Sequence, residues 1–296
     1  MASQTPIGKG KVGVVGAGLM GAEIALVYAL AGYGVRLADR TSAELDAAMQ
    51  RLSTILEKGV GRGFYRPEET GPALRRIETT TDLATFGDRD MVTEAVFEEE
   101  SVKAEIFRRL DAILPPHTLI ASNTSSIAIS TLASYVGPER RPNFVGTHYF
   151  SPVSRMKLVE VIPHFDTAEA SVERAMAYCR DAGKTPIRVK DVVGFAVNRV
   201  LHAFVIEAIK LVEEGVATPE DIDLACKLGL GHPIGPFELM DVTTSSLCLQ
   251  VQEILHSAYG ERFRPPSLLK QRVNAGYLGR RAGRGWLKSA DRKSRS

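Results

Sequence analysis

Two residues twelve positions apart, His148 and Glu160, have side chains suited to acid–base chemistry. Histidine transfers protons well because its unperturbed pKa lies near neutral pH, and His148 lies just after the apolar run Phe144–Gly146. Glu160 is the one acid in the apolar segment Lys157–Ile162, where a buried carboxylate needs a partner. A histidine would be such a partner, and the carboxylate would fix the ring's tautomer. From spacing alone, a purely structural pair or two unrelated surface groups remain alternatives.

A glycine-rich turn near the N-terminus is typical of dinucleotide binding. The apolar run Val12–Val15 leads into G-x-G-x-x-G, and a helical pattern follows at once. The first glycine permits a tight strand-to-helix turn, the second lets a pyrophosphate approach the backbone, and the third lets helix and strand pack closely. The helix N-terminus adds unpaired N–H groups and partial positive charge. The predicted cofactor contacts in this turn are Gly16, Gly18, Leu19, Met20 and Gly21.

Asp39 indicates which dinucleotide is favoured. It ends a second apolar strand, Val35–Ala38, where a carboxylate accepts hydrogen bonds from the adenosine ribose. The same carboxylate would repel the 2′-phosphate of NADP, so NAD is the predicted cofactor. Arg40 follows directly and is able to contact a phosphate, which leaves NADP open as the alternative.

Alternating apolar runs and helical patterns predict the elements that position these residues. The strand candidates are Val12–Val15, Val35–Ala38, Met91–Val96, Thr118–Ala121, Asn143–Gly146, Lys157–Ile162 and Pro186–Val189. The helical stretches between them include Thr41–Lys58, Ser101–Leu114 and Ala168–Ala182. This order predicts an α/β fold with a Rossmann-type, doubly wound parallel sheet. Ligands of such sheets bind at the carboxyl ends of the strands.

After Asp191 the apolar residues have helical spacing, and few segments have the pattern of a strand. The predicted helices are Gly194–Glu214, Thr218–Leu228 and Phe237–Tyr259, with Thr218 as a cap. We therefore predict an NAD-binding domain over residues 1–190 and an all-helical domain over residues 191–296 for substrate binding and dimerisation. The helices of the second domain offer more apolar faces than a small domain can bury, which predicts a homodimer.

Composition excludes several other classes of protein. The 296 residues carry a net charge of +2, which argues against nucleic acid as the main partner. No run of about 18 apolar residues predicts a membrane span. Residues 1–11 lack the apolar core of a signal peptide, and three separated cysteines without C-x-x-C spacing suit reduced thiols, so a cytoplasmic location is expected.

No histidine, cysteine and carboxylate cluster has zinc spacing, so we expect metal-free chemistry. Basic residues crowd the C-terminal end, which we interpret as a solvated tail.

Several motifs, in a fixed order, resemble those of the L-3-hydroxyacyl-CoA dehydrogenase family, and their appearance is closest to its 3-hydroxybutyryl-CoA dehydrogenases. The most specific is His148-Tyr149-Phe150-Ser151-Pro152-Val153 together with Met156-Lys157-Leu158-Val159-Glu160. The others are Ala121–Ser126, Gly194–Arg199, Gly235–Asp241 and Arg281–Gly285. With the glycine turn, the resemblance covers about residues 8 to 288. It implies NAD-dependent interconversion of L-3-hydroxyacyl-CoA, most simply short-chain, and 3-oxoacyl-CoA.

The resemblance also implies roles for individual residues. His148 would be the general base for oxidation and the general acid for reduction, and Glu160 would orient it and stabilise its charge. Ser125 and Asn198 would position the substrate oxygen near the nicotinamide. Arg62 falls where the family has a basic residue for coenzyme A. Further residues implied to lie by the cofactor are Glu98, Lys103, Ser125, Ser151 and Arg281.

Some positions and alternatives stay open. Ser151 stands where the family often has asparagine, Val193 stands where proline is usual, and Glu98 also suits an ordinary acidic first turn of a helix. One alternative function is a related dehydrogenase of a non-CoA 3-hydroxy acid, such as gulonate or carnitine. Another is a non-catalytic, crystallin-like NAD-binding protein on the same scaffold. The joint presence of the His148–Glu160 pair with Ser125 and Asn198 favours catalysis over the latter.

Overall fold

The chain divides into two units, residues 1–192 and 193–296. The computed structural model describes residues 9–288. Most of the N-terminal segment 1–11 therefore lies outside the described residues, as do the last basic residues of the predicted tail, Arg292, Lys293 and Arg295. Within residues 9–288, no helix combines the length and apolar character needed to cross a membrane.

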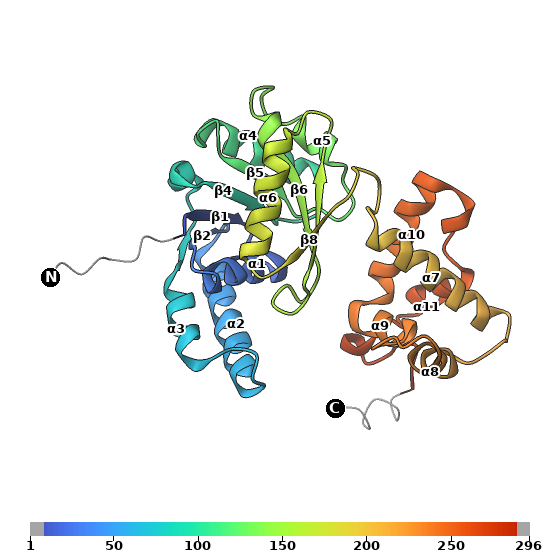
Figure 1. Cartoon of the computed structure of the whole chain (residues 1–296). Coiled ribbons are helices and arrows are strands. Elements are labelled where there is room, and N and C mark those ends of the chain that lie inside the picture. The colour runs from blue at the N-terminus through green and yellow to red at the C-terminus, as the bar shows by residue number, and fades with distance from the viewer. Residues whose placement is uncertain (1–8, 289–296) are drawn as a thin grey trace. The chain divides into compact units, whose positions relative to one another are not determined.

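The first unit is built around one sheet with the strand order β3-β2-β1-β4-β5-β6-β7-β8 (Figure 1). The strands are β1 (Lys11–Val15), β2 (Gly34–Ala38), β3 (Ile77–Thr80), β4 (Met91–Glu94), β5 (Leu119–Ser122), β6 (Phe144–Tyr149), β7 (Leu158–Pro163) and β8 (Thr185–Arg188). Neighbouring strands run parallel, except that β6 and β7 pair antiparallel. The predicted Rossmann-type α/β fold is confirmed, and this antiparallel pair is its one departure from an all-parallel sheet.

Helices cover both faces of the sheet (Figure 1). They are α1 (Leu19–Leu30), α2 (Ser42–Gly61), α3 (Pro67–Arg75), α4 (Glu100–Ile113), α5 (Ile129–Ala133) and α6 (Glu169–Asp181), with short 3-10 helices η1 (Leu83–Asp88) and η2 (Arg141–Asn143). Buried side chains of α1 and α6 join one core with β1, β2, β6 and β7. On the opposite face, Phe107 of α4 lies against Phe144 of β6, with ring centroids 4.9 Å apart. Because side chains alternate along a strand, His148 points to the same face as Phe144.

The second unit is helical. Its elements are α7 (Val197–Glu213), α8 (Pro219–Gly229), α9 (Pro236–Thr243), α10 (Ser245–Tyr259) and α11 (Ser267–Asn274), with 3-10 helices η3 (Glu261–Phe263) and η4 (Arg280–Ala282). Thr218 caps α8 as predicted, since its hydroxyl accepts the N–H of Asp221 at 3.1 Å. The stretch Phe237–Tyr259 is helical as predicted and forms two helices, because Thr244, with a φ of 136°, separates α9 from α10 and caps the latter.

Candidate functional site

The turn between β1 and α1 is built from backbone. Gly16 has a φ of +104°, and a Cβ there would lie 2.5 Å from the Ala95 carbonyl oxygen. A Cβ at Gly21 would lie 1.9 Å from the Gly16 carbonyl oxygen, so helix and strand are in close contact. Gly18 differs, because no described atom lies within 4 Å of a Cβ placed there. No described side chain caps α1 and its first turn holds no acid, so its N–H groups and positive end suit a pyrophosphate.

Asp39 directly follows β2 and lies beside this turn. One of its carboxylate oxygens accepts the Ala17 N–H at 2.5 Å and the other accepts the Arg40 N–H at 2.7 Å. The Arg40 guanidinium reaches Glu44 at 3.2 Å and lies 5.9 Å from the centroid of the exposed Phe97 ring. Glu44 therefore offsets part of the positive charge that could otherwise attract a 2′-phosphate.

His148 and Glu160 are direct cross-strand partners in the antiparallel β6–β7 pair. Side chains of such partners share a face of the sheet and meet. The Nδ1 atom of His148 lies 2.8 Å from Oε2 of Glu160, and its Nε2 lies 3.0 Å from the hydroxyl oxygen of Ser125. His148 is 4% exposed and Glu160 is fully buried. The strand prediction ended at Gly146, two residues short of His148, so the sequence did not reveal this register.

The two ring nitrogens have different partners, Glu160 at Nδ1 and the Ser125 hydroxyl at Nε2. A carboxylate only accepts hydrogen bonds, so the tautomer that donates from Nδ1 to Glu160 leaves Nε2 as an acceptor for the Ser125 hydroxyl. The ring edge packs against Phe150, with centroids 4.7 Å apart, which limits ring rotation. Nε2 is thus the atom of this group that can receive a further proton.

The loop that carries Ser125 is held by Glu98. One oxygen of Glu98, Oε1, accepts hydrogen bonds from the Thr124 hydroxyl at 2.6 Å, the Ser125 N–H at 2.8 Å and the Ser126 N–H at 2.9 Å. Burial disfavours the ionised carboxylate, but the Lys103 ammonium and these hydrogen bonds outweigh it and lower the pKa of Glu98. Glu98 therefore accepts these bonds as a carboxylate and does not belong to a merely solvated helix start.

Lys103, on α4, is enclosed in the protein. Its side chain has no exposed surface, and its ammonium lies 2.6 Å from Glu94 and 3.3 Å from Glu98. Glu94 ends β4, is likewise fully buried, and also accepts the Ser122 hydroxyl at 2.6 Å and the Val96 N–H at 2.7 Å. The contacts of Lys103 in the described structure are therefore with carboxylates inside the first unit.

The other predicted site residues occupy more exposed positions. Ser151 is exposed in the loop after β6, and Arg62 is exposed at the C-terminal end of α2. Asn198, half-buried, is the second residue of α7, and Arg281 is exposed in η4. The structure thus joins Ser125, His148, Glu160, Glu98 and Lys103 in the first unit, whereas Asn198 and Arg281 belong to the second.

Sequence reasoning missed Glu94, although its signal was available. Glu94 is a lone acid in the apolar run Met91–Val96, which is the same feature that drew attention to Glu160. Asn123 was also missed as an individual residue: its side-chain oxygen accepts the Tyr149 N–H at 2.9 Å and so holds the end of β6. No local sequence pattern predicts that hydrogen bond, because it joins a loop to a strand 26 residues away.

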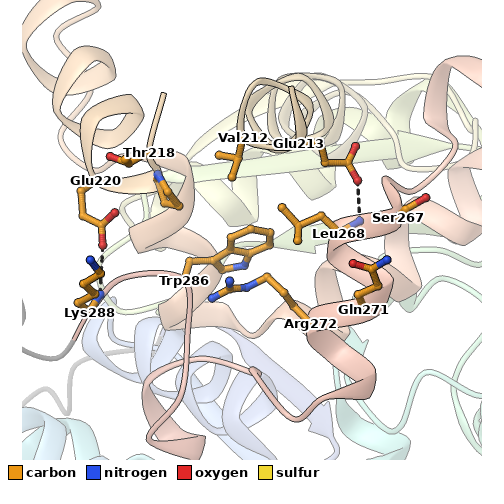
Figure 2. Close-up of a pocket in the computed structure, with 11 residues that line it drawn as sticks. Val212, Glu213, Thr218, Glu220, Ser267, Leu268, Gln271, Arg272, Trp286 and Lys288 are labelled. Atoms are coloured by element: carbon orange, nitrogen blue, oxygen red, sulfur yellow. Dashed lines mark hydrogen bonds between the residues drawn. The ribbon is translucent and has the colours of Figure 1, made fainter. Parts of the chain in front are cut away.

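A cavity of about 640 Å³ lies within the second unit, between α7, α8, α11 and the segment that holds Trp286 (Figure 2). The Arg272 guanidinium lies over the Trp286 ring, 4.3 Å from its centroid. Glu213 accepts the Leu268 N–H at 2.6 Å at one end of the cavity. None of the predicted site residues lines it.

Two family models match the chain. One, described as 3-hydroxyacyl-CoA dehydrogenase, NAD binding domain, matches residues 11–192. The other, described as 3-hydroxyacyl-CoA dehydrogenase, C-terminal domain, matches residues 194–289. The first match confirms NAD as the predicted cofactor.

Individual relatives are similar in sequence to this chain over most of their own length. A probable 3-hydroxybutyryl-CoA dehydrogenase of Bacillus subtilis is 40% identical over 282 residues, covering 95% of this chain and 98% of that protein. A 3-hydroxybutyryl-CoA dehydrogenase of Bradyrhizobium diazoefficiens is 40% identical over 277 residues, covering 93% and 94%. The crystal structure of an (S)-3-hydroxybutyryl-CoA dehydrogenase from Ralstonia eutropha matches with a TM-score of 0.88 and 37% identity, covering 93% of this chain and 97% of that one.

Proposed function

Because the chain belongs to the 3-hydroxyacyl-CoA dehydrogenase family, as its motifs predicted, we propose that it interconverts L-3-hydroxyacyl-CoA and 3-oxoacyl-CoA with NAD. The observation that carries this proposal is the hydrogen-bonded series Ser125–His148–Glu160. Short acyl chains are the proposed substrates, with 3-hydroxybutyryl-CoA as the type, because relatives of that name cover most of the chain.

The chain's own residues account for the proton in this reaction. Bound NAD supplies a hydride acceptor for oxidation, and NADH a donor for reduction. During oxidation, Nε2 of His148 accepts the proton of the substrate hydroxyl, and during reduction it returns a proton to the forming alkoxide. Glu160 stabilises the imidazolium through Nδ1 and keeps the ring oriented. The Ser125 hydroxyl, 3.0 Å from Nε2, positions the substrate oxygen at the same nitrogen.

The remaining predicted residues complete the proposal. The glycine turn with Leu19 and Met20 holds the pyrophosphate, and Asp39 holds the adenosine ribose. Ser151, Glu98 and Arg281 are proposed to lie by the cofactor, Asn198 to hold the substrate oxygen with Ser125, and Arg62 to contact coenzyme A. A role for Lys103 at the cofactor would act through Glu98, since Lys103 has no exposed surface. We place the protein in the cytoplasm.

We also propose a homodimer formed through the second unit. Three apolar side chains on or just after α8 are strongly exposed for their type: Leu224 at 46%, Leu228 at 79% and Leu230 at 63%. A neighbouring copy that covered them would remove this apolar area from water. Light scattering at micromolar concentration checks the assembly, and a particle of one chain mass, 32.2 kDa, would contradict it.

The decisive assay follows NADH oxidation with acetoacetyl-CoA and longer 3-oxoacyl-CoA esters, with free acetoacetate as the control. We expect turnover of the thioesters and little of the free acid. Turnover of CoA-free acids alone would favour the alternative dehydrogenase, and NADH binding without any turnover would favour a non-catalytic protein.

Cofactor preference has its own test. We expect a higher kcat/KM with NAD than with NADP, and Asp39→Ser should move the ratio toward NADP because it removes the charge that repels a 2′-phosphate. A wild-type preference for NADP would contradict the assignment of Asp39.

A further inference from the structure

We propose that Glu94 and Lys103 are positioning residues that hold Glu98 beneath the loop carrying Ser125, and thereby fix the Ser125 hydroxyl at His148. The inference rests on the proposed function, in which Ser125 and His148 act on the substrate oxygen. It extends that function from the residues near the substrate to an ion pair, Glu94 with Lys103, whose side chains have no exposed surface.

The network begins with an ammonium that has no solvent contact. A buried lysine remains charged only when carboxylates and hydrogen bonds replace its water. Lys103 has two such partners, Glu94 at 2.6 Å and Glu98 at 3.3 Å. Glu94 is anchored in turn by the Ser122 hydroxyl and the Val96 N–H, at 2.6 and 2.7 Å. The strand end therefore fixes the place of the ammonium, and the ammonium fixes the place of Glu98.

Glu98, held by Lys103, in turn holds the loop that carries Ser125. Its Oε1 atom accepts hydrogen bonds from three consecutive residues, Thr124, Ser125 and Ser126, at 2.6 to 2.9 Å. A single carboxylate oxygen thus sets the local course of the backbone at Ser125. The hydroxyl of the same residue lies 3.0 Å from Nε2 of His148. A continuous series of polar contacts joins Glu94 to the proposed proton acceptor.

Loss of the ammonium would disturb this series at its centre. Glu94 and Glu98 would be left with no cation between them, and burial would then favour protonation of at least one carboxyl group. A protonated Glu98, or one that moves toward water, accepts fewer bonds from the loop. Displacement of a positioning group by about 1 Å costs rate on the order of 10²-fold.

The test is Lys103→Met, alone and combined with Ser125→Ala, in the full-length enzyme. We expect Lys103→Met to lower kcat for acetoacetyl-CoA reduction by about 10- to 100-fold, with little change in the KM for NADH. In the Ser125→Ala background, the same substitution should change kcat by less than about 2-fold, because residues that act through one another are not additive. Equal losses in both backgrounds, or a loss confined to the KM for NADH, would overturn the proposal.

A matched control separates positioning from general stability. Arg140 is also a buried cation, 5% exposed, and it pairs with Asp111 of the same helix α4 at 3.1 Å, away from the Ser125 loop. Arg140→Met should lower stability yet leave kcat near the wild-type value. A kcat loss as large as that of Lys103→Met would mean that any broken buried ion pair on α4 suffices, which overturns the proposal.

Two further measurements keep the outcome interpretable. If Lys103→Met does not fold, Glu94→Gln replaces it in the same cycle with Ser125→Ala, since the amide keeps the size of the side chain and removes its charge. Wild-type enzyme and His148→Gln are assayed alongside. An inactive wild type, or an active His148→Gln, counts against the proposed function. An active wild type that is impaired by Ser125→Ala but unaffected by Lys103→Met and Glu94→Gln counts against this inference alone.

Discussion

Two buried histidines in this chain have opposite surroundings. His148, on β6 in the first unit, has the Glu160 carboxylate 2.8 Å from one nitrogen and the Ser125 hydroxyl 3.0 Å from the other. His202, on α7 in the second unit, is equally enclosed, at 6% exposed against 4% for His148. The Nδ1 atom of His202 lies 3.9 Å from the sulfur of Cys248. Burial lowers the pKa of His202 to about 4.

The contrast teaches that burial alone does not make a histidine useful for proton transfer. Taking an imidazolium out of water costs free energy, so an enclosed ring without a countercharge stays neutral. Cys248 supplies no such charge, because burial raises the pKa of its own thiol to about 12. A carboxylate beside the ring stabilises the imidazolium, as Glu160 can for His148. The partner of a histidine, more than its burial, therefore decides its chemistry.

The largest effect should come from removing each ring in turn. We expect His148→Gln to lower kcat for acetoacetyl-CoA reduction by about 10²- to 10⁴-fold, the usual contribution of a positioned acid–base group. NADH affinity, measured by fluorescence titration, should stay nearly intact because the glycine turn is separate from the ring. His202→Gln is the matched control and should leave kcat near the wild-type value. Near-normal turnover in His148→Gln would transfer the proton step to another residue and break the comparison.

A smaller loss is expected from Glu160→Gln. The amide oxygen can still accept the hydrogen bond from Nδ1 of His148, so ring orientation is kept while the negative charge is lost. We expect kcat to fall by about 10²-fold, the lower end of the acid–base range. Without the carboxylate the imidazolium is less favourable. Reduction needs the protonated ring as general acid, so the alkaline limb of the pH–rate profile for acetoacetyl-CoA reduction should move to lower pH. An unchanged profile would show that Glu160 only orients the ring.

Much of the fold followed from local pattern. The glycine turn after Val12–Val15 and the alternation of apolar runs predicted the Rossmann-type sheet. The elements β3, α3, α5 and α11 were not predicted, because they are short; in β3, for example, only Ile77 is buried. The antiparallel pairing of β6 with β7 was also missed, since a continuous apolar run indicates a buried strand without giving its direction.

Residues of the candidate site could be predicted only where the local sequence around them indicated their role. The isolated acid at Glu160 pointed to a buried partner, and the motif around His148 supplied it. The hydrogen bond from the Ser125 N–H to Glu98 joins residues 27 positions apart in two different loops. Such a contact depends on the order of β4 and β5 in the sheet and on the conformation of both loops. The periodicity of apolar residues predicts neither. The resemblance marked Glu98 and Lys103 as important without revealing how they act.

The smallest expected effect concerns the stability of the second unit in acid. The folded state keeps His202 neutral down to about pH 4, whereas the unfolded chain protonates this ring near the ordinary histidine pKa of 6.5. Between these values the unfolded state binds more protons, so stability is fully present above about pH 6.5 and falls as pH decreases toward 4. At about 1.4 kcal/mol per pKa unit, this proton contributes at most roughly 3 to 4 kcal/mol.

His202→Gln should remove that part of the acid sensitivity. Denaturant unfolding at pH 7 and pH 5, followed by the fluorescence of the single tryptophan, reports on this unit because Trp286 is buried in its core against Phe237. Other groups also titrate in this range, so the meaningful quantity is the difference in pH dependence between wild type and variant. We expect the variant to lose less stability than the wild type between the two pH values. Identical losses would mean that His202 is protonated in the folded protein, and the two histidines would then differ less than their surroundings indicate.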